Sequence, residues 1–374
     1  MSEWKNCTLG DLGEVVGGGT PSTKKPEYYG GDIAWITPKD LSTFSGRFIK
    51  HGERNITEEG LKGSSARLMP KNTILFSSRA PIGYVAIAEN EVSTNQGFKS
   101  IVPNDDTDYL FLYYLLKFNK DKIENMGSGT TFKEVSGKTV KAIDVTVPSN
   151  KEKQHEIAKI LGSLDDKIEN NRKINHHLVE LARSFWQERF SSKQPNGKLG
   201  DIIELFDSKR VPLSANQREK MDKIYPYYGA TSLMDYVDDY LFDGTYLLLG
   251  EDGTVIDKEG YPILQYVWGK FWVNNHAHIM VGKNGFTVES LFVLLKNTCV
   301  SSIVTGAVQL KINQANLKSV DVYIPQKEEL DNFNSTIEPI FDQLRNLYDE
   351  IKSLTTLRDA LLPKLMSGEI SVAD

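Results

Sequence analysis

The sequence predicts an α+β protein made of two tandem mixed α/β domains, each followed by a long helix, with the two helices pairing as an antiparallel coiled coil. Three observations support this prediction: an internal repeat, a heptad pattern of apolar residues after each copy of the repeat, and short strand-like segments between glycine-rich turns. At 374 residues, 40% of them hydrophobic, the chain is long enough for two or three domains with ordinary cores.

The internal repeat is visible at two places. Leu9-Gly10-Asp11-Leu12 returns as Leu199-Gly200-Asp201-Ile202. Further along, 129–148 matches 306–325 without a gap, so that Gly129 pairs with Gly306 and Pro148 with Pro325. We therefore predict one globular domain over 1–148 and a second over 197–325, after a polar linker that contains Pro195 and Gly197.

A heptad pattern follows each copy of the repeat. Apolar residues recur in alternating steps of three and four from Ile157 to Phe185 and again from Leu330 to Leu365. This spacing predicts long spacer helices over 149–192 and 326–370. Since one exposed helix of this kind is not stable alone, we expect the two to pack against each other around a pseudo-twofold axis.

Three residues interrupt the heptad seams, and a proline lies inside the second one. Asn171 and Asn175 lie in the first seam, where buried amides reduce stability but can set register, and Arg358 lies in the second. Pro339 predicts either a kink in the second helix or the start of its main part, with Ser335 or Thr336 as a nearby cap.

The globular copies contain strand-like and helix-like segments. Strands are predicted at 33–36, 73–76, 84–88, 245–249 and 271–273, and helices at 110–122 and near 291–296. These short segments favour an irregular mixed sheet in each domain.

Composition excludes several classes of protein. Cys7 and Cys299 are too few for a disulfide framework and lack the spacing of a zinc site, which predicts a reducing, cytoplasmic location. No apolar run approaches the roughly 20 residues of a membrane-spanning helix, and we expect no signal peptide. The net charge of −6 is the reverse of the basic surface expected of a DNA-binding protein, and 1–148 carries 18 basic and 18 acidic side chains.

The candidate catalytic motifs are incomplete, so we expect no enzyme activity and no bound metal or cofactor in this chain. Gly17-Gly18-Gly19 lacks the Gly-Lys-Ser/Thr ending of a phosphate-binding loop, and Ser78 lacks a Gly-x-Ser-x-Gly elbow. His276 and His278 alternate as two metal ligands would, but no cysteine or carboxylate cluster is evident beside them, and structural histidines are favoured.

A set of local motifs makes the duplicated chain resemble the specificity subunit of type I restriction-modification systems. These are Leu9-Gly10-Asp11, Ile33-Ala34-Trp35-Ile36-Thr37-Pro38-Lys39-Asp40-Leu41-Ser42, Ser78-Arg79-Ala80-Pro81-Ile82-Gly83, Thr94-Asn95-Gln96-Gly97, Val147-Pro148 and Leu365-Met366-Ser367-Gly368-Glu369-Ile370. Each is weak alone, but their order and the duplication cover essentially the whole chain. The second copy has no counterpart of the motif that begins at Ile33 or of the motif that begins at Ser78.

The resemblance implies a non-catalytic subunit whose two target-recognition domains each read one half of a bipartite sequence in double-stranded DNA. Its implied partners are two methyltransferase subunits, which hold S-adenosylmethionine and flip the target adenine, and restriction/translocase subunits. Basic surfaces on these partners would supply the positive charge that this chain lacks.

Direct readout favours Arg or Lys for guanine and Asn or Gln for adenine, in loops able to enter a groove. On this basis we predict DNA contacts by the residues Lys39, Arg79, Gln96, Thr131 and Lys133 in the first copy and Lys209, Arg210, His276, Gln309 and Lys311 in the second. The loops that begin at Gly129 and Gly306 are favoured most, because the glycine repeats at the same offset while the residues directly after it differ between the two copies.

Two other functions remain open from the sequence. The chain could be an autonomous DNA enzyme, although it lacks the required motifs. Alternatively, it could be a coiled-coil interaction module whose globular ends bind protein or carbohydrate through aromatic residues such as Tyr225, Tyr227, Tyr228 and Trp272.

Overall fold

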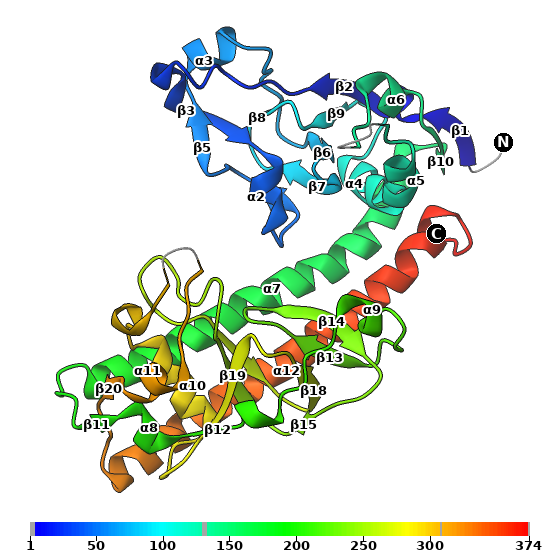
Figure 1. Ribbon diagram of the computed structural model, residues 1–374. Helices are drawn as coiled ribbons and strands as arrows, with labels where there is room; N and C mark the ends of the chain where they lie inside the picture. Colours follow the sequence, from blue (N-terminus) through cyan, green and yellow to red (C-terminus); the bar gives the residue numbers. More distant parts are fainter. Residues whose placement is uncertain (1–3, 129–132, 307–308, 373–374) are drawn as a thin grey trace. The chain divides into compact units, whose positions relative to one another are not determined.

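The computed structural model describes residues 4–128, 133–306 and 309–372, which belong to two compact units. Unit 1 is Met1–Asn170 with Glu350–Asp374, and unit 2 is Asn171–Asp349. Each unit contains one globular domain and part of each of two long helices, α7 (Lys151–Phe190) and α12 (Lys327–Met366) (Figure 1).

The domain of unit 1 is built on two sheets and a two-stranded ribbon. The larger sheet has the order β2 (Gly13–Gly17), β9 (Lys99–Pro103), β6 (Ile74–Ser78), β7 (Ile82–Ala88), β4 (Phe48–Ile49), and the smaller has the order β5 (Arg54–Ile56), β3 (Tyr29–Ile36), β8 (Ser93–Thr94). The ribbon pairs β1 (Trp4–Thr8) with β10 (Asp144–Pro148). The short helices are α1 (Leu9–Leu12), η1 (Pro26–Tyr28), α2 (Pro38–Ser42), α3 (Glu58–Lys62), α4 (Tyr109–Phe118), α5 (Lys120–Asn125) and α6 (Gly137–Lys141).

The domain of unit 2 has two four-stranded sheets and a similar ribbon. The sheets have the orders β12 (Ile203–Leu205), β19 (Ala277–Gly282), β16 (Tyr246–Gly250), β17 (Leu264–Val267) and β14 (Leu233–Val237), β13 (Tyr225–Tyr228), β18 (Lys270–Val273), β15 (Phe242–Asp243). The ribbon pairs β11 (Gly197–Lys198) with β20 (Asp321–Val322). The short helices are α8 (Leu199–Ile202), η2 (Asp207–Lys209), α9 (Ala215–Arg218), α10 (Val288–Lys296), η3 (Ser301–Ile303) and α11 (Gln314–Lys318).

The two domains share one topology. The order β2-β9-β6-β7 in unit 1 corresponds to β12-β19-β16-β17 in unit 2, and all neighbouring strands in both series are antiparallel. The parallel pair β3 and β8 corresponds to the parallel pair β13 and β18. The register agrees as well, because Ile74 lies opposite Ile101 and Leu247 lies opposite Met280. The sequence repeat is therefore a structural repeat.

A buried helix packs into the core of each domain. In unit 1, Asp108 caps α4 by accepting a hydrogen bond from the backbone N–H of Phe111, and Phe111 and Leu112 are fully buried. In unit 2, Thr287 caps α10 in the same way, and Leu291 is fully buried. Burying each such side chain contributes roughly 1.5–3 kcal/mol. In each domain the buried helix contacts both the sheet and a long helix, so the three share one hydrophobic core.

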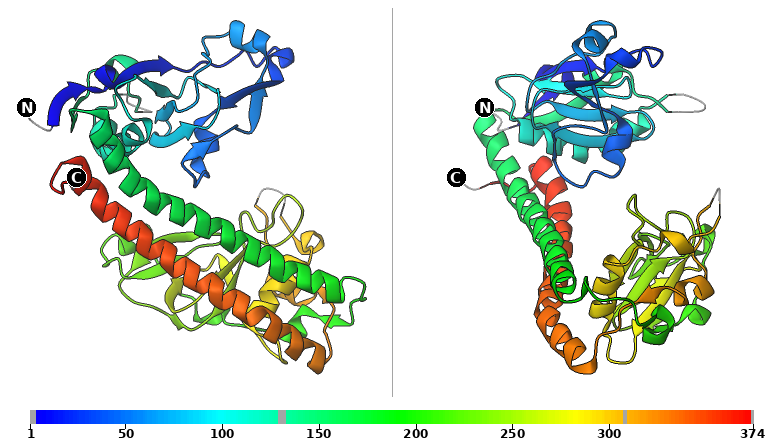
Figure 2. Two further views of the ribbon diagram at one scale, coloured as in Figure 1. Left: turned by 180° about the vertical axis from the view of Figure 1, so that it is seen from behind. Right: turned by 90° about the vertical axis from the view of Figure 1, so that its left-hand side faces the viewer.

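The long helices pair in an antiparallel manner. In unit 1, Asp165 in the first half of α7 bonds Arg358 in the second half of α12. In unit 2, Trp186 near the end of α7 packs edge-on against Phe333 near the start of α12, with ring centroids 5.2 Å apart. Figure 2 shows the helices side by side in both views. The predicted fold class, with two mixed α/β domains and paired long helices, is confirmed.

Local predictions were partly wrong at two helices. Helix α12 begins at Lys327, so Pro339 does not begin its main part, and Ser335 and Thr336 donate hydrogen bonds to carbonyl groups one turn earlier instead of capping it. The apolar seam continues on both sides of Pro339 and keeps the helix packed. The predicted helix at 110–122 is two helices, because Asn119 ends α4 by donating its side-chain N–H to the Leu115 carbonyl. Among the described residues, no helix is long and apolar enough to cross a membrane.

Candidate functional site

A loop repeats at equivalent positions in the two domains. In unit 1, the backbones of Ser128 and Glu134 exchange two hydrogen bonds of 3.1 and 3.0 Å, and in unit 2 Thr305 and Lys311 do the same at 2.9 and 2.8 Å. Each loop is then fixed to the end of a central strand, by Val135 N–H donating to the Ser78 carbonyl and by Ile312 N–H donating to the Glu251 carbonyl. These pairings make Ser128 and Glu134 structurally equivalent to Thr305 and Lys311, as the two ends of a loop in each domain.

The predicted contacts on these loops have different outcomes. Lys133 and Gln309 are exposed at the ends of their loops, as a groove-contacting role requires. Thr131 and the leading Gly129 lie outside the described residues. Gly306 has a φ of 92°, which favours glycine, and a Cβ at this position would lie 2.1 Å from the Gln309 carbonyl oxygen.

A second pair of equivalent turns lies beside the loops. Asn95 N–H donates to the Ile36 carbonyl at 3.0 Å, and the Asn95 side-chain oxygen accepts from Gly97 N–H at 2.9 Å. In unit 2, Asn274 N–H donates to the Tyr228 carbonyl at 3.0 Å, and its side chain accepts from His276 N–H at 2.8 Å. The middle residues of the turns are Gln96 and Asn275, and both are exposed.

Sequence reasoning chose Gln96 but missed Asn275. The second domain has no Thr-Asn-Gln-Gly motif, so the equivalence is hidden at the level of identical residues. The available signal was the pair of adjacent amide residues, Asn95-Gln96 and Asn274-Asn275, each just before a strand.

In unit 1, the predicted contacts lie on neighbouring segments. Arg79 follows β6 and places its guanidinium 3.5 Å from the Glu134 carboxylate, next to Lys133. Ser78 N–H donates to the Gly97 carbonyl at 2.7 Å, which holds this strand end against the Gln96 turn. Lys39 is exposed on α2 and is paired with Glu53 at 2.9 Å. The structure therefore brings Arg79, Gln96 and Lys133 to one end of the sheet.

In unit 2, most predicted basic contacts are paired with carboxylates. Arg210 donates to Glu251 at 2.7 Å and to the Ala277 carbonyl at 2.7 Å, and only 13% of its side chain is exposed. Lys311 lies 3.4 Å from Glu251, and His276 lies 2.9 Å from Asp252. The structure therefore gathers Arg210, His276 and Lys311 around Glu251 and Asp252.

Lys209, the remaining predicted basic contact of unit 2, is exposed and places its ammonium group 4.9 Å from the centre of the Phe206 ring.

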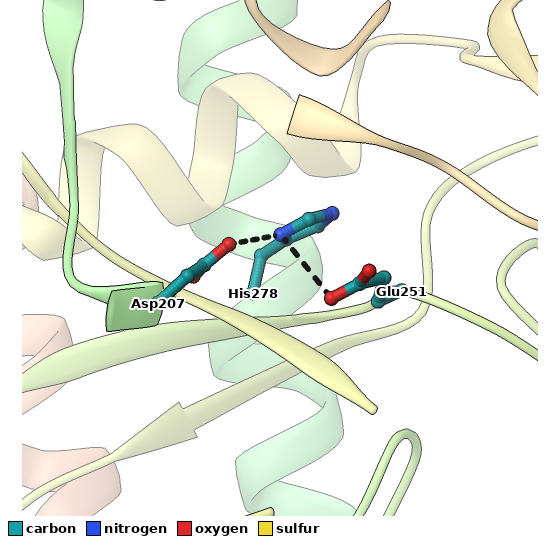
Figure 3. Close-up of side chains that lie close together, drawn as sticks. All are labelled: Asp207, Glu251 and His278. Carbon is teal, nitrogen blue, oxygen red and sulfur yellow. Dashed lines mark hydrogen bonds and ion pairs between the residues drawn. The ribbon is translucent and has the colours of Figure 1, made fainter. Parts of the chain in front are cut away.

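Beneath these residues lies a cluster of Asp207, Glu251 and His278, of which Asp207 and His278 are buried (Figure 3). His278 Nδ1 lies 2.6 Å from Asp207, and its Nε2 donates to the Ile312 carbonyl at 2.8 Å. Burial alone would raise the pKa of Asp207, but hydrogen bonds from His278 and from Ile279 N–H hold that pKa below its usual value. The cluster thus holds Ile312, which follows the end of the loop, against the end of β16.

The spacing of this cluster would suit a divalent cation, but its charges are already matched. Arg210 lies 3.6 Å from Asp207 and 2.7 Å from Glu251, and Lys311 also contacts Glu251. A cation would have to displace these groups and the His278 hydrogen bond, so a structural role fits better. The expectation that no carboxylate cluster lies beside the histidines was wrong, because Asp207 and Glu251 are distant in sequence from His278.

The loop stems carry opposite charges in the two domains. The backbones of Arg79 and Glu134 form a β-bridge, and the equivalent β-bridge in unit 2 joins the backbones of Asp252 and Lys311. In unit 1 the residue at the strand end is basic and the residue at the loop end is acidic. In unit 2 the strand end is acidic and the loop end is basic. The same backbone frame therefore presents different electrostatic surfaces, as two domains with different ligand preferences would.

Comparison with known proteins places these features in a family. A sequence profile of the family described as "Type I restriction modification DNA specificity domain" matches residues 1–179 and 193–359. This chain belongs to that family. The family membership agrees with the duplicated domains and with the predicted resemblance.

Two specificity subunits illustrate the relationship. The chain is 36% identical to the type I restriction enzyme MjaIX specificity subunit of Methanocaldococcus jannaschii, over 100% of this chain and 94% of that protein. It is 24% identical to the EcoprrI specificity subunit of Escherichia coli, over 93% of this chain and 90% of that protein. This chain is accordingly a type I specificity subunit.

A solved structure supports the fold of this specificity subunit. The crystal structure of the type I restriction-modification S subunit from M. genitalium matches 97% of this chain and 96% of that chain, with a TM-score of 0.54 and 19% sequence identity. At that identity the likeness concerns the fold alone.

Proposed function

We propose that this specificity subunit reads a bipartite sequence in double-stranded DNA, with one half-site recognised by each domain. The observation that carries the proposal is the repeat, at equivalent places in the two domains, of one pair of backbone hydrogen bonds that closes a loop and of one exposed amide turn. A duplicated frame with diverged side chains suits two half-sites of different sequence. Helices α7 and α12, each 40 residues and so about 60 Å long, suit the task of spacing the half-sites.

We further propose that the chain acts by recruiting enzymes rather than as an enzyme. Its partners would be two methyltransferase subunits and restriction/translocase subunits, with S-adenosylmethionine bound by the methyltransferases. The net charge of −6 supports this division of labour, because phosphate neutralisation must then come largely from partner surfaces. In this role the chain positions DNA and leaves the chemistry of methylation or cleavage to the partners.

The test is base-modification sequencing of genomic DNA from cells that carry this chain with its methyltransferase, compared with cells that lack only this chain. We expect a methylated motif with two specified halves around an unspecified gap, lost when the chain is absent. Unchanged methylation without the chain, or no methylation with a demonstrably active methyltransferase, would contradict the proposal. The coiled-coil interaction module would then be the better explanation.

A further inference from the structure

We infer that Gln96 and Asn275 are equivalent base-reading residues, each of which recognises an adenine in the half-site of its own domain. This inference rests on the proposed function and goes beyond it, because it assigns one residue and one kind of base to each half-site. It also replaces His276, chosen from the sequence, with its neighbour Asn275 as the main reader in this turn.

The backbone establishes the equivalence of the two residues. Gln96 lies between Asn95, which bonds to the end of β3, and Gly97, which leads into β9. Asn275 lies between Asn274, which bonds to the end of β13, and His276, which leads into β19. Because β3 corresponds to β13 and β9 to β19, the two amides occupy the same place in the topology.

A residue from the segment after the first sheet strand supports each turn. In unit 1, Thr20 follows β2 and donates its hydroxyl to Gln96 Oε1. In unit 2, Arg210 follows β12 and donates to the backbone carbonyl of Asn275 at 3.3 Å. In unit 1 the side-chain amide of Gln96 is thus held before a ligand arrives, whereas in unit 2 the backbone that carries the Asn275 side chain is held.

The chemistry of the two amides suits adenine. In the major groove adenine presents a donor at N6 and an acceptor at N7, and one Asn or Gln amide can meet both. The Thr20 hydroxyl uses one acceptor position of Gln96 Oε1, which leaves the second for adenine N6 and leaves Nε2 as a donor for N7. Asn275 offers the same pair of groups from an exposed position.

The neighbouring basic residues are poorer candidates because acidic partners hold them. Arg79 is paired with Glu134, Arg210 with Glu251, and Lys311 with Glu251. A guanidinium or ammonium group that turns to DNA must first give up its ion pair with the carboxylate, whereas an amide needs no such exchange. We therefore assign Arg79, Arg210 and Lys311 to positioning of the loops and the amides to base readout.

The experiment compares the methylated motif made by the wild-type chain with those made by Gln96→Ala and Asn275→Ala, each assembled with the methyltransferase. We expect Gln96→Ala to relax one A·T position in one half-site and Asn275→Ala to relax one A·T position in the other, with discrimination falling roughly 10- to 100-fold at that position. Gln194→Ala removes an exposed amide in the linker and should leave the motif unchanged.

A binding measurement covers variants whose methylation is too weak to sequence. The assembled complexes are titrated with duplexes that carry the wild-type motif or one substituted base pair, and folding is checked by the melting temperature. Gln96→Glu and Asn275→Asp keep the side-chain shape but lose the donor, so they should also lose the preference for A·T. A folded variant that keeps every base preference, relaxes both halves, or weakens all duplexes equally would overturn the inference. Absence of any split motif with the wild-type chain would instead contradict the proposed function.

Discussion

Arg358 donates a hydrogen bond of 2.6 Å to Asp165 between the two long helices of unit 1. Asp165 is almost completely buried and also accepts from the Tyr114 hydroxyl at 2.6 Å. Burial, together with the negative charge of Asp165, raises the pKa of Tyr114 well above its usual value. The interruption of the apolar seam at Arg358 is therefore a charge matched to a buried carboxylate.

Replacing Arg358 with Met should destabilise unit 1, because Asp165 would be left as a buried charge without its cation. We expect the free energy of unfolding to fall by about 3–5 kcal/mol, measured by urea denaturation followed by circular dichroism. The pair Lys167 and Glu350 is the matched control, since it is exposed and 3.5 Å apart, and Lys167→Ala should change stability by less than about 1 kcal/mol. Equal stabilities of Arg358→Met and the wild type would show that the buried pair contributes nothing.

Replacing Asn175 with Leu should stabilise unit 2. Asn175 is 5% exposed in the helix seam, and neither its side-chain oxygen nor its nitrogen has a hydrogen-bond partner within the described part of the chain. Removing an unsatisfied buried amide should raise the free energy of unfolding by about 1–3 kcal/mol, measured by the same denaturation. Asn170→Leu on the exposed face of α7 is the control and should have little effect. A less stable Asn175→Leu variant would mean that the amide is needed for helix register.

Features with a short sequence period could be predicted, because the pattern and the contact lie in the same few residues. The heptad steps from Ile157 and Leu330 predicted both long helices, and the gapless match of Gly129 with Gly306 predicted the equivalent loops. The ion pair of Arg210 with Glu251 could not be predicted, since 41 positions separate the partners and only the folded sheet joins them. Asn275 was missed because its turn shares the hydrogen bonds of the Gln96 turn but not the residues around it.

Acidification should destabilise unit 2 through Asp207. Its pKa is lowered in the folded chain, so the unfolded state binds more protons near the ordinary pKa of about 3.9, and the stabilisation is complete above that pH. It is lost as the pH falls through the lower folded-state pKa. Thermal unfolding between pH 6 and pH 3 should therefore show a steeper decline for the wild type than for Asp207→Asn.

At pH 6 the Asp207→Asn variant should itself be less stable, by about 3–5 kcal/mol, because Arg210 and His278 lose a buried partner. Asp238→Asn changes an exposed carboxylate of the same domain and serves as the control. If the wild type and Asp207→Asn decline in parallel from pH 6 to pH 3, Asp207 is not the group responsible.

Replacing Gly306 with Ala should impair recognition of one half-site while leaving most of the fold intact. The added Cβ would meet the Gln309 carbonyl oxygen at 2.1 Å, and the φ of 92° would be strained for any other residue. The loop backbone must therefore shift, and it carries the exposed Gln309. We expect weaker methylation and relaxed preference in the half-site of the second domain, with the other half unchanged, measured by base-modification sequencing.

Two glycine variants separate the possible causes of that effect. Gly269 has a φ of 77° with nothing within 4 Å of a new Cβ, so Gly269→Ala tests backbone strain without a steric clash. Gly17 has open space and no positive φ, so Gly17→Ala should behave as the wild type. If Gly306→Ala and Gly269→Ala lose methylation equally, strain in the domain is the cause. A loss confined to Gly306→Ala would instead tie half-site recognition to the shape of the loop over 306–310.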